Sequence, residues 1–436
     1  MKIKFFGAAG EVGRSCIMIS TDKTKILLDS GIKLGKNEEY PVIDDEEIKN
    51  IDAIFISHAH IDHCGFLPFL YSKGYKNSIF ATKPTIEIIN VLLSDYLRLN
   101  SDLNFEKNIL NSLNSRFKII DYKKDFKFRD LTIKFIPAGH ILGSALISIS
   151  DGKNTIVYTG DINLLKTRLL NGADLKNIAA DTLITETTYG GDKDIFPEEK
   201  QVANQLLNTI NESAKTNSKI IIPSFAVGRA QEILFFLDDY INSGMMQKIP
   251  IYVDGMINKV LRIYRHNVIF CRKELQSRIL MSDYDPFKSK NFKIVDRKNI
   301  RNYIIAKDEP CIIVTTSGML TGGPVMFYLS KLAQNENNKL ILVGYQAQGT
   351  LGRDLQDGIN KITINNAEID VKLKVETFHI SAHADRKQLE QIPLKIRGLK
   401  NIFLVHGEIG KLQQLEAQFS KKYNVKIAQL NTEYEV

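Results

Sequence analysis

The stretch "HAHIDH", residues 58–63, places three histidines and an aspartate within six positions. The whole chain of 436 residues has only eight histidines, so a chance surface cluster explains this stretch poorly. In extended backbone, His58, His60 and Asp62 would recur every second residue and face the same side. His63 follows where the chain turns. Imidazole and carboxylate are typical zinc ligands, and a catalytic zinc keeps one position open. Four ligands are too many for one such ion, so we predict that two metals share this stretch.

Further candidate ligands follow apolar stretches that are typical of β-strands. His140 follows "LTIKFI", Asp161 follows "NTIVY" and His406 follows "NIFLV". Each lies in a glycine-containing loop, where a rigid scaffold commonly presents functional side chains. A single histidine or aspartate at a strand end is more often structural, but beside "HAHIDH" we interpret all three as ligands. Asp29, in "ILLDSG", belongs to the same class and is expected to orient a ligating histidine by accepting its second ring N–H.

Composition restricts the class of protein. The chain is 44% hydrophobic and 25% charged, as in soluble globular proteins. No apolar run reaches the roughly 18 residues of a membrane span, so we expect no membrane association. The four cysteines form no CxxC pair, which predicts no disulfide framework and a cytoplasmic location. The net charge of +8 suits a polyanionic partner, although a solvated lysine-rich surface fits that value equally well.

The pattern of apolar residues divides the chain into two styles. Residues 1–190 contain many short β-type runs and one helical stretch, "TIEIINVLLSDYLRLN". From about residue 200, strand–glycine loop–helix units recur, which is typical of a doubly wound parallel sheet. The strand-rich style returns after residue 365. We therefore predict an α/β protein in which residues 201–365 are inserted into an outer domain made of residues 1–200 and 366–436.

The motifs together resemble a known group of enzymes. "HAHIDH" resembles the HxHxDH signature of the metallo-β-lactamase fold, and Asp29, His140 and Asp161 match its other motifs. "LITETTYG", "SAHAD" and "VHGE" resemble motifs A, B and C of the β-CASP nucleases, carried by Glu186, His383 and His406. That group includes the nuclease subunit of the cleavage and polyadenylation machinery and ribonuclease J. The resemblance implies an αββα metallo-β-lactamase fold with an inserted β-CASP domain.

The resemblance also implies a zinc-dependent ribonuclease with two Zn²⁺ ions. One ion would be held by His58, His60 and His140, the other by Asp62, His63 and His406, with Asp161 bridging both. A hydroxide between the metals would be the nucleophile. His383 would be the general acid, positioned by Glu186, and His379 is a weaker candidate for tuning it. A histidine at motif C resembles the RNA-cleaving branch of the group.

Two glycine-containing loops of the inserted part are candidate phosphate contacts. In "PSFAVGRAQE", Ser224 and Arg229 flank the expected start of a helix, where free N–H groups bind phosphate. In "SGMLTGGP", Ser317 and Thr321 stand beside glycines that allow close backbone approach. Taken alone, both loops are more typical of plain turns and helix caps than of phosphate contacts. With the resemblance, we interpret them as contacts with the RNA backbone.

The expected substrate is RNA, cleaved internally and, as a second mode, from the 5′ end, in RNA processing, 3′-end formation or decay. We expect no RNA-binding domain ahead of the first strand. A homodimer and an RNA-processing or decay complex are further expectations from the resemblance. A non-catalytic RNA-binding scaffold is one alternative, disfavoured because no ligand position is vacant. A small-molecule metallo-hydrolase is another, but such an enzyme has no reason to carry the inserted module.

Overall fold

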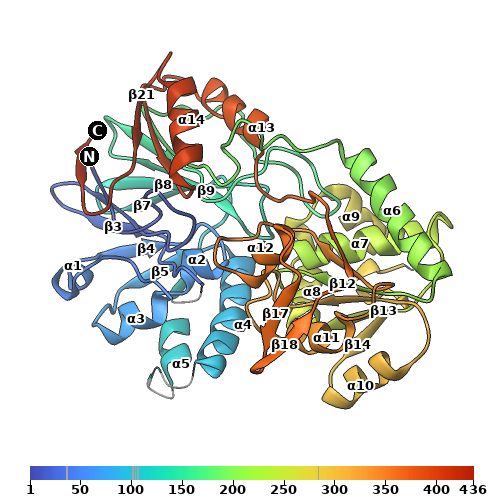
Figure 1. The fold of residues 1–436 in the computed structure, drawn as a ribbon. Helices are drawn as coiled ribbons and strands as arrows, with labels where there is room; N and C mark the ends of the chain where they lie inside the picture. Colours follow the sequence, from blue (N-terminus) through green and yellow to red (C-terminus); the bar gives the residue numbers. More distant parts are fainter. Residues whose placement is uncertain (36–37, 101–102, 104, 106–107, 283) are drawn as a thin grey trace. The chain divides into compact units, whose positions relative to one another are not determined.

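The structure is a computed structural model that describes residues 1–35, 38–100, 103, 105, 108–282 and 284–436. The chain forms two compact units (Figure 1). Unit 1 consists of Met1–Lys166, Leu170–Ile195 and Ala382–Val436, and unit 2 of Thr167–Leu169 and Phe196–Ser381. The domain boundaries predicted at residues 200 and 365 stay a prediction. Among the described residues, no helix combines the length and apolar character that a membrane span requires.

Unit 1 contains two seven-stranded sheets, ordered β22-β1-β2-β3-β4-β5-β6 and β21-β20-β11-β10-β9-β8-β7. The first consists of β1 (Lys2–Phe5), β2 (Ile17–Ser20), β3 (Lys25–Leu28), β4 (Ala53–Phe55), β5 (Ser78–Ala81), β6 (Phe117–Ile119) and β22 (Glu433–Glu435). The second consists of β7 (Asp125–Phe128), β8 (Leu131–Pro137), β9 (Ala145–Ser150), β10 (Thr155–Tyr158), β11 (Thr182–Glu186), β20 (Asn401–Val405) and β21 (Asn424–Ile427). The last strands of the chain therefore complete both sheets.

The two sheets share one apolar core. Strand side chains alternate between faces, and Ile133 and Phe135 of β8 accordingly meet Phe5 of β1 and Phe55 of β4 in one buried cluster. The other face of the second sheet is covered by α13 (Arg386–Gln391) and α14 (Ile409–Phe419). The first sheet is accompanied by α1 (Asp45–Lys49), α2 (Ile61–Cys64), α3 (Leu67–Ser72), α4 (Lys83–Leu99) and α5 (Ile109–Asn114) (Figure 1). Unit 1 thus has helix, sheet, sheet and helix layers, the αββα order.

The helix expected in "TIEIINVLLSDYLRLN" is α4. Its first turn is stabilised by Thr82, whose side chain accepts a hydrogen bond from the N–H of Thr85 at 3.4 Å. Pro84 fits the first turn because it has no N–H to satisfy there. The buried side chains recur at helical spacing, namely Ile88, Ile89, Leu92, Leu93 and Tyr96. The amphipathic pattern therefore predicted this element correctly.

Unit 2 is built on a six-stranded parallel sheet of order β14-β13-β15-β12-β16-β19, with a separate hairpin, β17–β18. Its strands are β12 (Lys219–Pro223), β13 (Ile251–Asp254), β14 (Phe292–Val295), β15 (Cys311–Thr315), β16 (Lys339–Leu342), β17 (Lys361–Ile364), β18 (Ala367–Asp370) and β19 (Lys374–Thr377). Its helices are α6 (Glu199–Lys215), α7 (Arg229–Asn242), α8 (Ile257–His266), α9 (Lys273–Met281), α10 (Lys298–Ala306), α11 (Pro324–Leu332) and α12 (Leu351–Gln356). This alternation of strand and helix is the doubly wound arrangement that the sequence predicted.

The loops that follow β12, β15 and β16 meet at the carboxyl edge of this sheet. The amide Nε2 of Gln346 donates to the carbonyl of Gly318 at 3.1 Å. A Cβ atom added to Gly318 would lie 2.8 Å from the backbone nitrogen of Phe225, so only glycine fits there. The carboxyl edge of a parallel sheet is the usual place for ligands.

A short strap, made of Thr167, Arg168 and Leu169, belongs to unit 2 although the chain on either side of it belongs to unit 1. The carboxylate of Glu232 accepts hydrogen bonds from the backbone N–H groups of Arg168 and Leu169, both at 3.2 Å. Arg272 donates from Nη1 to the carbonyl of Thr167 at 2.7 Å and from its backbone N–H to the carbonyl of Leu169 at 2.9 Å. Four backbone groups of three residues are therefore satisfied by two residues of unit 2.

Candidate metal centre

The stretch "HAHIDH" runs from the loop after β4 into α2. The N–H of His63 donates to the carbonyl of His60 at 2.9 Å, so a helical turn begins directly after His60. Asp62 therefore lies in a helix, and the prediction that extended backbone carries His58, His60 and Asp62 on one side is wrong for Asp62. The turn nevertheless separates the stretch into two pairs. His58 and His60 belong to one group of potential metal ligands, and Asp62 and His63 belong to a second group.

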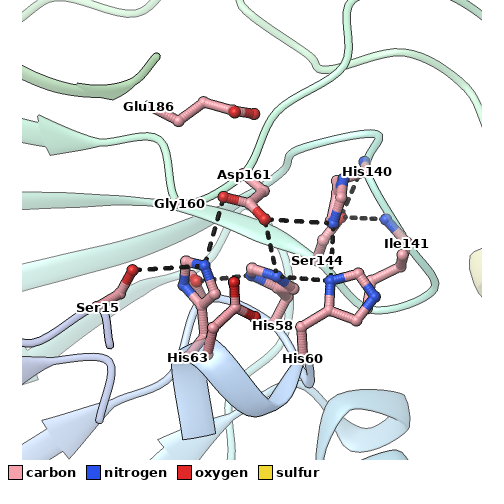
Figure 2. A network of polar contacts seen from close by, with 12 residues as sticks. Ser15, His58, His60, His63, His140, Ile141, Ser144, Gly160, Asp161 and Glu186 are labelled. Carbon is pink, nitrogen blue, oxygen red and sulfur yellow. Dashed lines mark hydrogen bonds and ion pairs between the residues drawn. The ribbon is translucent and has the colours of Figure 1, made fainter. Parts of the chain in front are cut away.

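The first group contains His58, His60, His140 and Asp161, whose ligand atoms all lie within 4.8 Å of one another (Figure 2). Nδ1 of His60 lies 3.2 Å from Nε2 of His58 and 3.1 Å from Nε2 of His140. Oδ2 of Asp161 lies 3.3 Å from Nε2 of His58 and 3.5 Å from Nε2 of His140. A tetrahedral zinc ion with bonds of about 2.05 Å holds its ligand atoms roughly 3.3 Å apart, so these spacings match such a site.

Hydrogen bonds behind the first group direct its ring nitrogens inward. Nδ1 of His58 lies 3.0 Å from the hydroxyl of Ser57, and Nδ1 of His140 lies 2.8 Å from the carbonyl of Ala382. A carbonyl only accepts, so Nδ1 of His140 carries the proton and Nε2 presents a lone pair to the centre. Partners of this kind fix the tautomer and the ring orientation of metal-binding histidines.

The histidines of the first group are neutral at pH 7. Burial lowers the pKa of His58, lowers that of His140 well below its usual value and lowers that of His60 to about 3. Neutral imidazole is the form that binds a metal. Lone pairs that face one another at these distances repel unless a cation lies among them. The donor set of the first group therefore fits a metal ion.

The second group contains Asp62, His63 and His406. Nε2 of His406 lies 3.3 Å from Oδ2 of Asp62. Oδ1 of Asp161 lies 3.4 Å from Nε2 of His63 and 3.5 Å from Nδ1 of His406. That oxygen is buried and accepts no hydrogen bond from any described residue. The two carboxylate oxygens of Asp161 are thus divided, one facing each group.

The second group has an excess of negative charge. Burial disfavours the charged form of His63, but the carboxylates of Asp161 and Asp29 outweigh burial and raise the pKa of His63 well above its usual value. Burial also opposes ionisation of Asp161, yet the neighbouring His63 and His406 hold its pKa well below the usual value. Positive charge at this position is therefore strongly favoured, and a bound cation would supply it in place of the proton. The second group also fits a metal ion.

Asp29 lies behind the second group, as the sequence predicted for an orienting residue. Its Oδ2 lies 2.7 Å from Nδ1 of His63 and accepts hydrogen bonds from Tyr158 and Ser57, both at 2.7 Å. The residue is fully buried. Its φ is 59° and that of His406 is 52°, a left-handed conformation that is unfavourable outside glycine and recurs at functional sites. Both residues follow directly on a strand of the core.

Glu186 and His383 lie together at the margin of the centre. Nδ1 of His383 lies 3.1 Å and 3.0 Å from the two carboxylate oxygens of Glu186. Glu186 is buried, and its Oε1 also accepts the N–H of Ile162 at 2.7 Å. The His383 ring lies 4.5 Å from that of His140, between centroids, and its side chain keeps 16% of its surface exposed. Glu186 also forms a potential metal-binding group with Asp161 and His406.

The predicted phosphate contacts lie in unit 2, at the loops after β12 and β15. Ser224 is buried, its N–H donates to the carbonyl of Thr315 at 2.8 Å, and its hydroxyl has no hydrogen-bond partner among the described residues. The hydroxyl of Ser317 accepts the N–H of Thr321 at 3.0 Å. Arg229 is the buried first residue of α7. These four residues border the carboxyl edge of the parallel sheet.

Three polar residues at the centre were not predicted. The hydroxyl of Thr188 lies 3.2 Å from Nδ1 of His406, and Ser57 and Tyr158 contact Asp29 as described above. Each stands within three positions of a predicted site residue, which is the sequence signal that could have identified it. All three are buried in the structure. His379, by contrast, stacks on Phe196 in unit 2, with ring centroids 5.5 Å apart.

Three family descriptions match the chain. A metallo-beta-lactamase superfamily domain matches residues 18–188, a Beta-Casp domain matches residues 230–355, and a Zn-dependent metallo-hydrolase RNA specificity domain matches residues 368–428. The first match contains "HAHIDH", His140, Asp161 and Glu186, and the third contains His383 and His406.

Several curated proteins are similar over most of the chain. An RNase J-like protein of Methanocaldococcus jannaschii is 38% identical over 407 residues, which cover 93% of this chain and 92% of that protein. Transcription termination factor FttA of the same organism is 38% identical over 432 residues, covering 94% of this chain and 67% of that protein. FttA of Lokiarchaeum is 36% identical, covering 97% and 69%. A crystal structure of an Enterococcus faecalis protein of unknown function covers 100% of this chain and 99% of that one, with a TM-score of 0.59 and 13% identity, and supports the fold alone.

Proposed function

Because the chain belongs to the β-CASP group of the metallo-β-lactamase superfamily, we propose that it is a zinc-dependent ribonuclease that hydrolyses RNA phosphodiester bonds with two metal ions. Membership confirms the resemblance and the fold class predicted from the sequence. The observation that carries the proposal is the division of the Asp161 carboxylate between two groups of ligands. A single carboxylate placed in this way suits a bridge between two cations.

The residues that would hold the metals follow from the two groups. His58, His60 and His140 would hold one ion, Asp62, His63 and His406 the other, with Asp161 shared. Nitrogen and carboxylate donors in this number are typical of zinc. When bound, a pair of such ions lowers the pKa of water toward about 7 and stabilises negative charge on the oxygens of a phosphodiester. The protein's own part is to fix the donors, through Asp29, Ser57 and the carbonyl of Ala382.

His383 would supply the proton that the departing ribose oxygen needs. The carboxylate of Glu186 faces Nδ1 of the ring, so Nε2 is the atom that would give up the proton. The backbone N–H of Ile162 holds Glu186 in place, which makes Glu186 a positioning residue. The partial exposure of His383 suits a group that must meet a substrate. Acid catalysis by a positioned histidine is worth roughly 10²–10⁴-fold in rate.

RNA is proposed as the substrate because the third family match is described as an RNA specificity domain and one relative is named an RNase J-like protein. Ser224, Arg229, Ser317 and Thr321 are proposed to contact the RNA backbone. The names of the relatives support a role in RNA processing, decay or transcription termination. A homodimer and an RNA-processing or decay complex are proposed from the family resemblance alone. Four buried cysteines without a disulfide support a cytoplasmic location.

One experiment tests the reaction and its mode. The purified protein is incubated with a linear RNA labelled at its 5′ end and with a circular RNA of the same sequence, each with and without EDTA. Cutting of the circle demonstrates internal cleavage, and release of only 5′ mononucleotides demonstrates the exonuclease mode. EDTA should abolish both. Binding of RNA without metal-dependent cleavage would support the scaffold alternative, and turnover of a generic thioester without RNA cleavage would support the small-molecule hydrolase.

A substitution at the metal centre tests whether RNA cleavage depends on the bound metal. Asp161→Asn keeps the shape of the side chain and removes its charge, so both activity and bound zinc, measured by mass spectrometry of the metal, should fall. Cleavage at the parental rate by a protein that has lost its zinc would overturn the two-metal proposal.

A further inference from the structure

The positive charge of the chain is concentrated in one part of unit 2. Residues 259–307 contain thirteen lysines and arginines against four acidic residues, a net charge of +9. The whole chain carries +8, so all other residues together contribute −1. The segment comprises α8, α9, β14, α10 and the loops between them. The basic composition noted above is therefore a local property.

Some of these basic side chains form ion pairs or hydrogen bonds with other residues of the protein. Four of the thirteen basic side chains are partly buried and form ion pairs, namely Arg265 with Asp285, Arg278 with Asp239, Arg301 with Asp254 and Lys307 with Glu309. Arg272 is engaged with the strap. The remaining eight are exposed, and none of them forms an ion pair with a described carboxylate.

Five of these exposed side chains stand within eleven positions, in "KSKNFKIVDRK", and we call them the edge patch: Lys288, Lys290, Lys293, Arg297 and Lys298. β14 lies in the middle of this segment and is an edge strand, which pairs with β13 and with no other described strand. Two further exposed basic residues, Lys259 and Arg262, lie on α8. This helix packs beside the short 3-10 helix η3 (Pro286–Lys288), which ends at the first residue of the edge patch. The charges thus gather at one border of the sheet.

We propose that the edge patch, extended by Lys259 and Arg262, binds the phosphate backbone of single-stranded RNA at positions other than the scissile bond. This inference rests on RNA being the substrate of the proposed function. Unpaired lysine and arginine side chains bind phosphates without reading bases, and they release counterions from the nucleic acid. The patch would therefore add affinity for longer RNA without adding sequence preference.

A purely protective role is the competing explanation. Lysine on an exposed edge strand prevents pairing with a strand of another molecule. That role requires charge on β14 itself, which Lys293 supplies. It does not require Arg297 and Lys298, which lie beyond the end of β14, or the two residues of α8. The extent of the patch favours a bound polyanion.

The test compares two variants that lose the same charge. One carries Lys288→Gln, Lys290→Gln, Lys293→Gln and Lys298→Gln. The control carries Lys127→Gln, Lys153→Gln, Lys395→Gln and Lys421→Gln, four exposed lysines of unit 1. Binding of a fluorescent single-stranded RNA is measured by anisotropy in EDTA over a range of salt concentrations. The slope of log K against log salt is negative, and each lost phosphate contact makes it less steep by roughly 0.7. We expect the slope of the patch variant to become less negative by about 1.5–3 and that of the control to stay at the parental value.

Equal slopes for both variants would overturn the inference. Self-association of the patch variant on size exclusion with unchanged RNA binding would also overturn it, in favour of edge protection. So would loss of binding to anionic vesicles without loss of RNA binding. Because binding is measured in EDTA, it does not depend on hydrolysis. A protein that binds RNA through the patch but never cleaves it would overturn the ribonuclease proposal alone.

Discussion

Nδ1 of His383 lies 3.0 Å from Oε2 of Glu186, although 197 positions separate the two residues in the chain. Glu186 ends β11, in the middle of the second sheet of unit 1, and His383 stands just before α13. The contact between the two side chains is therefore supported by a core strand on one side. This arrangement gives the histidine a defined orientation and a role that can be separated from metal binding.

Replacing His383 should affect the rate and leave the metals in place. His383→Ala should lower the rate of RNA cleavage by about 10²–10⁴-fold because the leaving oxygen loses its proton donor. Glu186→Gln should cause a smaller loss, since the ring remains but is held less firmly. Zinc content should equal that of the parent in both. Lys387→Ala, an exposed change on α13, serves as control. Cleavage by His383→Ala at the parental rate would show that another group supplies the proton.

Replacing Asp29 should act through His63. Asp29→Asn removes the charge that holds Nδ1–H of His63, and loss of such a partner typically weakens metal affinity by about 10–100-fold. Tyr158→Phe removes one hydrogen bond to the same carboxylate and should have a milder effect. Zinc affinity can be measured by competition with a coloured chelator. Unchanged affinity in Asp29→Asn would mean that the surrounding packing alone orients His63.

The strap should contribute to the stability of unit 2. Glu232→Ala leaves the N–H of Arg168 without its acceptor and that of Leu169 with only the Thr167 hydroxyl, 3.3 Å away, which should cost about 1–3 kcal/mol in the free energy of unfolding. Glu232→Gln keeps one acceptor oxygen and should cost less. Urea unfolding followed by circular dichroism gives the comparison, with the exposed Glu336→Ala as control. Equal stability of Glu232→Ala and the control would mean that water replaces the carboxylate at no cost.

The cysteines should be unreactive in the folded protein. Burial raises the pKa of Cys271 and of Cys311 to about 12, and raises those of Cys16 and Cys64 well above the usual value. At pH 8 all four thiols therefore stay protonated, and the thiolate is the reactive form. Mass spectrometry after iodoacetamide should find no modified cysteine in the native protein and four after unfolding. Rapid modification of Cys64 in the native state would indicate that the region of α2 opens.

The sequence predicted those features of the centre that local patterns encode. His140, Asp161 and His406 each follow an apolar strand, and strand ends are the places where a core scaffold fixes side chains. Their division into two groups came only from the family resemblance, since spacing along the chain does not show which strands are neighbours. The structure brings all seven predicted ligands together in unit 1.

Other features depend on contacts that no local pattern shows. The carbonyl of Ala382 orients His140 across 242 positions, and a backbone carbonyl leaves no trace in the residue type. The helical turn at Asp62 also escaped prediction, because four residues are too few to show helical periodicity. The strap was likewise invisible, since its partners Glu232 and Arg272 resemble ordinary helix-surface residues when read in sequence.

The strap also bears on what belongs to the inserted unit. It begins six positions after Asp161, yet four of its backbone groups bond to Glu232 and Arg272 of the inserted unit. A chain lacking residues 196–381 would lose these four hydrogen bonds. An insert without counterparts of Glu232 and Arg272 would leave those groups to water. The strap and the inserted unit are therefore matched to each other, although the chain on either side of the strap belongs to unit 1.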